Sequence, residues 1–262
     1  AKDQVFMTAA QAWGREKGST ADHLLVLKEI VKQQKKSRKP LYLVFLDVTK
    51  AYDKAWLDGI LYNLYNRGVT GPTWNMIRKL NLNLKVEIKT NHGLTRPIQI
   101  RDIIRQGGVL SVLLYAAIMD EISTETMKEN LGIQIKNQNT KVGCMLWMDD
   151  VVLISDNREE MQELLNKTNE VANMYHLEFG KEKSKVMTLN TNDTQALKLG
   201  DMELEKTDKY KYLGETISSK ANLCEQLGEA KKKAELSIAG NPQLRGIQME
   251  TIWKLIQSYK HA

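Results

Sequence analysis

Apolar residues recur with helical spacing in several long stretches of this chain. In residues 18–36 they fall at every third or fourth position, and Ser19 or Thr20 is suited to cap the helix start. Similar spacing predicts further helices, one of them beginning near Pro72 and one ending before Gly68. The predicted helices cover residues 18–36, 53–68, 71–83, 113–130 and 157–176, with more helix in the last forty residues.

Shorter apolar runs between these helices predict strands. Residues 41–48, LYLVFLDV, are nearly all apolar, which indicates a strand buried on both faces that ends at the aspartate Asp47. Two more runs flank Met148, Asp149 and Asp150, and we expect residues 132–136 to be their neighbour. The other predicted strands are 84–90 and 96–100, joined by a hairpin near Gly93, and 186–190, 197–205 and 210–218, with a turn at Gly200 and Asp201.

This order of elements predicts an α+β fold. Strands and helices alternate irregularly, which favours a mostly antiparallel sheet backed by helices over a doubly wound parallel sheet. The 262 residues can bury a large core as one domain or two, and they contain no internal repeat.

Composition and charge limit which classes of protein this chain can belong to. Hydrophobic residues make up 42% and charged residues 27%, as in ordinary globular proteins, and we expect neither a membrane span nor a signal peptide. The start without methionine suggests an excised fragment. Two distant cysteines and four scattered histidines argue against a disulfide scaffold or a zinc knuckle. The net charge of +6 favours a polyanionic partner but does not identify one.

Three carboxylates stand where buried strands end. Asp47 closes one apolar run, and Asp149 and Asp150 lie between two others. Isolated carboxylates beside apolar surroundings are unfavourable, so they are usually paired or bound to a cation, and Mg²⁺ suits oxygen ligands that share the ion with phosphates. An Asp-Asp pair between strands is also a common hairpin turn, and an aspartate after a strand often caps a helix. These residues alone leave the alternatives open.

Five blocks of sequence, in order, resemble the motifs of reverse transcriptases. An upstream block, QAWGREKGSTADHLL, looks like the fingers motif of non-LTR, LINE-like retroelement enzymes, so the resemblance extends over nearly the whole chain. The five blocks are FLDVTKAYDKAW, RQGGVLSVLLYAAIMDEI, WMDDVVLIS, LEFGKEKSKVM and YKYLGETIS.

The resemblance implies a right-hand polymerase fold and a set of site residues. Asp47, Asp149 and Asp150 would be the catalytic carboxylates and, with the carbonyl of Val48, the ligands of Mg²⁺ or Mn²⁺. Two other groups of residues would contact the substrates. The residues implied to bind the dNTP are Arg15, Tyr52, Gln106, Gly107 and Lys183, and the implied primer grip is Tyr212, Leu213 and Gly214.

The same resemblance implies subdomains, partners and a location. Residues 1–40 would be part of the fingers, residues 41–220 the palm with fingers elements at about 69–104, and residues 221–262 the start of a thumb. The partners would be an RNA template, a DNA primer and dNTPs, without a membrane, and the location would be the nucleus or cytoplasm.

The sequence departs from the family pattern at three positions. Val112 replaces a proline, Trp147 replaces a tyrosine or phenylalanine, and Gly180 replaces an asparagine. Segments of the fingers and thumb also look missing. We therefore expect an RNA-directed DNA polymerase core, and keep two alternatives: a truncated or domesticated domain that binds nucleic acid or a partner without synthesis, and another two-carboxylate enzyme such as a nuclease or cyclase.

Overall fold

The computed structural model describes residues 7–12, 19–49, 56–82, 84–100, 104, 108, 110–134 and 141–220. The chain divides into two compact units, residues 1–217 and 218–262. The helices predicted for the last forty residues lie outside the described residues, and the predicted fingers, palm and thumb boundaries stay predictions. Within the described part of the chain, no helix combines the length and apolar character that crossing a membrane requires.

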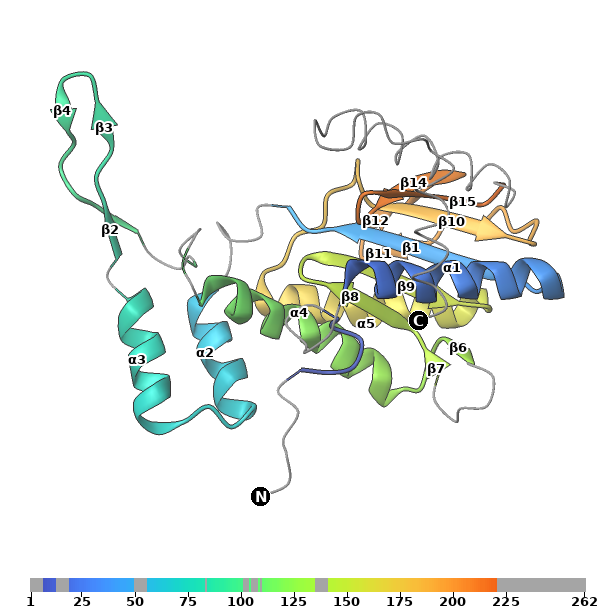
Figure 1. Cartoon of the computed structure of the whole chain (residues 1–262), viewed down its shortest axis with the longest axis horizontal. Helices are drawn as coiled ribbons and strands as arrows, with labels where there is room; N and C mark the ends of the chain where they lie inside the picture. Colours follow the sequence, from blue (N-terminus) through green and yellow to red (C-terminus); the bar gives the residue numbers. More distant parts are fainter. Residues whose placement is uncertain are drawn as a thin grey trace, which may run out of the picture. The chain divides into compact units, whose positions relative to one another are not determined.

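The first unit is built on a five-stranded sheet in the order β13-β10-β1-β9-β8. Figure 1 labels β10, β1, β9 and β8 of this sheet. Each neighbouring pair is antiparallel except β10 with β13, which are parallel. Helices pack against this sheet, so the predicted α+β class with a mostly antiparallel sheet is confirmed. The strands are β1 (Leu41–Asp47), β8 (Cys144–Trp147), β9 (Asp150–Ser155), β10 (Lys185–Leu189) and β13 (Glu205–Lys206).

The central strand β1 has apolar residues on both faces because it separates two cores. Tyr42, Val44 and Leu46 belong to one core, which they share with helices α2 (Leu57–Asn66), α4 (Ser111–Lys128) and α5 (Arg158–Tyr175). The alternate residues, including Phe45, face a second core with α1 (Thr20–Ser37). The near-continuous apolar run in the sequence therefore reflects burial on both sides, as predicted.

Polar side chains cap two of the long helices. The hydroxyl of Ser19 accepts a hydrogen bond from the backbone N–H of Asp22 at 3.1 Å, which confirms one of the two predicted caps of α1. The side chain of Asn157 accepts from the N–H of Glu160 at 2.9 Å at the start of α5. The predicted helix 53–68 is described from Leu57 onward as α2.

Helix α3 (Gly71–Asn81) packs against α2 and carries Pro72 in its first turn, as expected. A ribbon follows it, in which β2 (Leu84–Val86) pairs with β5 (Ile98–Ile100), and β3 (Lys89–Thr90) pairs with β4 (Gly93–Leu94). The hairpin predicted near Gly93 is therefore confirmed.

Three small hairpins complete the described elements. They pair β6 (Ile133–Gln134) with β7 (Lys141–Val142), β11 (Lys198–Leu199) with β12 (Met202–Glu203), and β14 (Lys209–Tyr212) with β15 (Glu215–Ser218). The turn at Gly200 and Asp201 was predicted. The expected pairing of residues 132–136 with the strands around Met148 was wrong, because β6 pairs locally with β7.

Candidate functional site

Two carboxylates lie opposite each other at one end of the sheet. Asp47 is the last residue of β1, Asp150 is the first residue of β9, and the two are direct cross-strand partners. Directly opposed residues of antiparallel strands share a face, with Cα atoms about 4.5–5.5 Å apart. The structure thus brings together Asp47 and Asp150, and the turn between β8 and β9 places Asp149 beside them.

Asp150 is partly buried and lies close to the charges of the other two carboxylates. Burial raises the pKa of Asp150 from 3.8 to about 6, and the nearby charges of Asp149 and Asp47 add to this rise. The ammonium of Lys183 lies 3.4 Å from Oδ2 of Asp47 and is the cation next to this group. The side chain of Lys183 is 72% exposed, so separating its ammonium from Asp47 costs little free energy.

The carboxylate oxygens of Asp47, Asp149 and Asp150 suit a hard divalent cation whose remaining ligands come from a substrate. Carboxylate oxygens that repel one another favour a positive ion between them, and Mg²⁺ is typically held by one or two carboxylates together with substrate phosphates. Among the described residues, no three or more side chains of His, Cys, Asp or Glu lie close enough together to hold a metal ion, so Asp47, Asp149 and Asp150 are not preformed as a three-ligand group. The structure therefore provides the Asp47–Asp150 pair with Asp149 next to it, and a substrate phosphate would have to add further ligands to an ion held there.

The backbone hydrogen bonds around Val48 direct the Val48 carbonyl toward β9. Val48 forms an isolated antiparallel bridge with Phe179, flanked by hydrogen bonds from Thr49 N–H to the Glu178 carbonyl at 2.8 Å and from Gly180 N–H to the Asp47 carbonyl at 2.9 Å. In this pattern the bridged residue points its own N–H and C=O away from its partner. The Val48 carbonyl is thereby directed toward the side where Asp150 lies.

Two small residues fix the backbone of Asp47. The hydroxyl of Ser184, which is fully buried, accepts a hydrogen bond from the Asp47 N–H at 3.3 Å. A Cβ at Gly180 would come within 2.8 Å of Cγ2 of Thr49 and 3.7 Å of Oδ2 of Asp47. Glycine at the position where the family pattern has asparagine thus permits this close approach.

The turn that carries Asp149 is strained. It consists of Met148 and Asp149, and Met148 has a φ of 57°, a conformation that bulky side chains rarely adopt. The side chain of Gln11 accepts a hydrogen bond from the Met148 N–H at 3.1 Å. A contact from a distant segment therefore holds the turn in place.

The predicted primer-grip residues form a tight hairpin turn between β14 and β15. Leu213 and Gly214 both have positive φ, 45° and 81°, as in a type I′ turn. Tyr212 is only 2% exposed, and its hydroxyl lies 2.9 Å from Nε2 of His23. Leu213 and Gly214 are the more accessible part of this predicted grip.

Tyr210 is a residue of this region that the sequence did not single out. Its ring stacks on Phe45 with centroids 4.2 Å apart. Burial raises the pKa of Tyr210 to about 12, and the charges of Asp47 and Asp150 add to this rise. The alternation of Tyr210 and Tyr212 along one strand was the available signal, because alternate residues share a face.

The other departures from the family pattern are accommodated locally. Trp147 is the cross-strand neighbour of Asp150 and makes an edge contact with His23, with ring centroids 6.1 Å apart. Val112 lies in the first turn of α4, where proline is tolerated but not required. The implied nucleotide contacts Arg15, Tyr52, Gln106 and Gly107 lie outside the described residues.

Several known proteins are similar to this chain. A polyprotein of a type-1 R2 retrotransposable element from Nasonia vitripennis is 26% identical over 211 residues, which are 76% of this chain and 20% of the relative. The type-2 R2DM polyprotein from Drosophila melanogaster is 24% identical over 208 residues, or 74% of this chain and 19% of that protein. The chain thus spans about a fifth of the length of these relatives.

Solved structures show the same fold at low identity. Apo telomerase from Candida tropicalis, truncated from its C-terminal domain, has a TM-score of 0.54 at 13% identity, covering 77% of this chain and 39% of that one. Telomerase from Candida albicans, in a complex with a fragment of telomeric RNA, has a TM-score of 0.54 at 10% identity and covers 83% and 38%.

The family profile described as reverse transcriptase (RNA-dependent DNA polymerase) matches residues 4–217, most of the chain. Together with the R2 relatives, this match confirms the resemblance to non-LTR, LINE-like enzymes. The chain belongs to the reverse transcriptase family.

Proposed function

We propose that this chain is the polymerase core of an RNA-directed DNA polymerase that adds dNTPs to a DNA primer on an RNA template. The observation that carries the proposal is the cross-strand pair of Asp47 and Asp150, with Asp149 in the adjoining turn. The R2 relatives and the telomerase solved with telomeric RNA support a nucleic-acid partner.

The residues of the site would share the work of nucleotidyl transfer. Asp47, Asp149, Asp150 and the carbonyl of Val48 would hold divalent cations, Mg²⁺ or Mn²⁺. When bound, such ions would lower the pKa of a hydroxyl nucleophile and neutralise phosphate charge. Because β9 pairs with β1 from Tyr42 to Asp47, the backbones of Asp47 and Asp150 are held opposite each other before the substrate arrives.

Further residues would bind and orient the nucleotide. Lys183 stands beside Asp47 on an exposed, flexible side chain, so its ammonium can turn to the triphosphate when the carboxylate binds a cation. Arg15, Tyr52, Gln106 and Gly107 are proposed, from the family resemblance, to contact the incoming dNTP. Leu213 and Gly214 would support the primer through the turn between β14 and β15.

The test is Asp149→Asn in the full-length protein, because this change removes a charge with almost no change in shape. Primer extension on an RNA template with a DNA primer should fall by at least about a thousandfold, whereas the far-UV circular dichroism should not change. Asp201→Asn, in the β11–β12 turn, is the matched control and should extend primers normally. Unchanged extension by the Asp149 variant would refute the assignment.

The same assay separates the proposal from its alternatives. A domain that only binds nucleic acid would retain template-primer without extending it, in the presence of either Mg²⁺ or Mn²⁺. A nuclease would release nucleotides without needing a primer. Extension by the wild-type protein that depends on Asp149 excludes both.

A further inference from the structure

A short segment near the start of the chain adds a strand beside β8. The N–H of Ala12 donates to the Leu146 carbonyl at 3.0 Å, and the N–H of Leu146 donates to the Ala10 carbonyl at 2.9 Å. Between these two bonds, Gln11 and Leu146 form a parallel bridge. Residues 7–12 thereby run along the strand that leads into the turn carrying Asp149.

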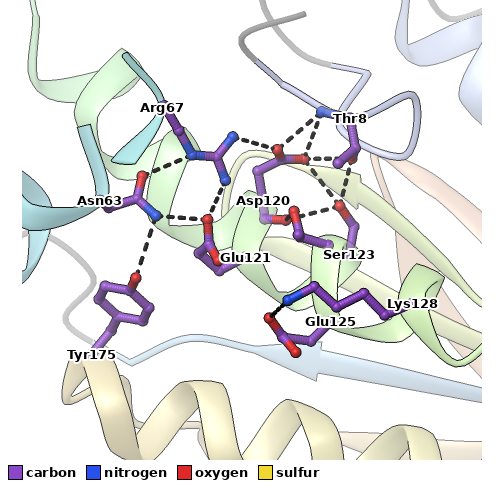
Figure 2. A network of polar contacts seen from close by, with 10 residues as sticks. Thr8, Asn63, Arg67, Asp120, Glu121, Ser123, Glu125, Lys128 and Tyr175 are labelled. Atoms are coloured by element: carbon purple, nitrogen blue, oxygen red, sulfur yellow. Dashed lines mark hydrogen bonds and ion pairs between the residues drawn. The ribbon is translucent and has the colours of Figure 1, made fainter. Parts of the chain in front are cut away.

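A network of charged and polar side chains anchors this segment, as Figure 2 shows. The N–H of Thr8 donates to Asp120 Oδ2 at 2.9 Å, and its hydroxyl donates to Oδ1 of the same carboxylate at 2.5 Å. Asp120 is completely buried in α4 and also pairs with Arg67 of α2, whose Nη1 lies 2.9 Å from Oδ2. The segment is thus tied to two helices.

Gln11 connects this anchored segment to the turn. Its side chain is completely buried, and its Oε1 accepts the N–H of Met148 at 3.1 Å. Met148 is the turn residue with positive φ, so the hydrogen bond acts on the strained part of the backbone. A neutral acceptor suits this place, because a carboxylate would carry a buried charge and an aliphatic side chain would leave the N–H without this partner.

We infer that Gln11 is a positioning residue, which holds the turn so that Asp149 and Asp150 bind a divalent cation in the right geometry. This inference rests on the proposed function, because it names how the carboxylate site is kept in shape. Groups that orient metal ligands from behind typically change metal affinity or activity by about 10–100-fold when they are removed. An effect of that size is expected here.

The test compares Gln11→Met with Gln34→Met in the full-length protein. Methionine has a similar length but lacks the amide acceptor. Gln34 is also a buried glutamine, and its Oε1 accepts from the hydroxyl of Ser37 at 3.3 Å, near the opposite end of β1 from Asp47. The two variants therefore each lose one side-chain hydrogen bond, but only Gln11 lies near the carboxylates.

Terbium provides a readout apart from activity, because Trp147 lies next to the turn and can sensitise the luminescence of a bound Tb³⁺ ion. Gln11→Met should weaken Tb³⁺ binding by about tenfold or more, and should raise the Mg²⁺ concentration for half-maximal extension similarly. The KM for template-primer should stay unchanged, and Gln34→Met should leave all three quantities at the wild-type values.

Hydrogen exchange at the Met148 amide tests the contact itself. Exchange should accelerate in Gln11→Met and not in Gln34→Met. If the amide stays equally protected, or if both variants bind Tb³⁺ alike, the inference is overturned while the function can still stand. If the wild-type protein neither binds Tb³⁺ nor extends primers, the proposed function fails, and the positioning role fails with it.

Discussion

Asp150 is a single residue of the candidate site whose ionised side chain lowers the stability of the folded protein. Burial raises the pKa of its side chain to about 6, and the charges of Asp149 and Asp47 add to this rise, whereas an unfolded chain would leave it near 3.8. Above pH 6 the folded protein therefore holds an ionised group that it disfavours. A cation bound by the proposed site would reverse this penalty.

Asp150→Asn should therefore stabilise the protein in the absence of divalent ions. At pH 7 we expect a gain of about 1–2 kcal/mol in the free energy of unfolding, after allowance for solvent screening, and a melting temperature higher by a few degrees. The gain should shrink toward pH 5, where a proton already neutralises the wild-type group. Thermal unfolding in EDTA measures it, with Asp201→Asn as control. A lower melting temperature than wild type would contradict the expected repulsion.

Helix α1 and strand β14 meet through a buried histidine, a contact between elements far apart in sequence. Nε2 of His23 lies 2.9 Å from the hydroxyl of Tyr212, and His23 is 5% exposed. Burial lowers the pKa of His23 from 6.5 to about 4 and raises that of Tyr212 above its usual range. Both groups are thus kept neutral at the contact between the two elements.

The free energy of unfolding should consequently depend on His23 between pH 6.5 and 4. In this range the unfolded chain binds a proton that the folded protein rejects, so stability falls as pH falls, by on the order of 3 kcal/mol across the window. Urea unfolding at several pH values should show this contribution disappear in His23→Gln.

The control for His23 is His92→Gln, in the exposed turn between β3 and β4. This variant should keep the wild-type dependence on pH. The carboxyl of Asp150 contributes with the opposite sign in the same range, because its pKa is raised, and therefore only the difference between variant and wild type reports on His23. Equal slopes in all three proteins would contradict the shifted pKa.

At the scale of the whole first unit, the network in Figure 2 joins three parts of the chain. Arg67 of α2 contacts Asp120 and Glu121 of α4 at 2.9 and 2.6 Å, and Asp120 binds the segment that contains Thr8. Arg67 is 14% exposed and Asp120 is fully buried. A buried pair of this kind is more sensitive to the loss of one partner than it is stabilising overall.

Arg67→Met should destabilise the protein by roughly 3–5 kcal/mol, because it leaves a buried carboxylate without its counter-charge. Adding Asp120→Asn to this variant should recover part of the loss. Urea unfolding measures both effects. Lys167→Met removes a solvent-screened pair with Glu170 and should change stability far less than Arg67→Met does. A similar loss in the Arg67 and Lys167 variants would show that burial does not matter here.

The sequence predicts the carboxylate cluster well because the signal is local. Apolar runs that end at Asp47 and begin at Asp150 are visible without a structure, whereas the pairing of these two runs comes from the structure. Gln11 could not be found in this way. Its segment has no strand-like alternation, and its position depends on contacts with Asp120, which lies more than a hundred residues away in sequence. The local pairing of β6 was missed for a related reason, since its partner is a strand of two residues.

The position of β1 has a consequence for synthesis of the chain on the ribosome. Its six apolar residues pair with β9 and β10, which are made long after it. At about 5–20 residues per second, β1 waits on the order of ten seconds for β9 to be synthesised. During that time β1 is an exposed apolar segment without a strand partner, and segments of this kind are prone to aggregate. Helix α1, which is made before β1 and shares a core with it, can cover one face of β1 during this time.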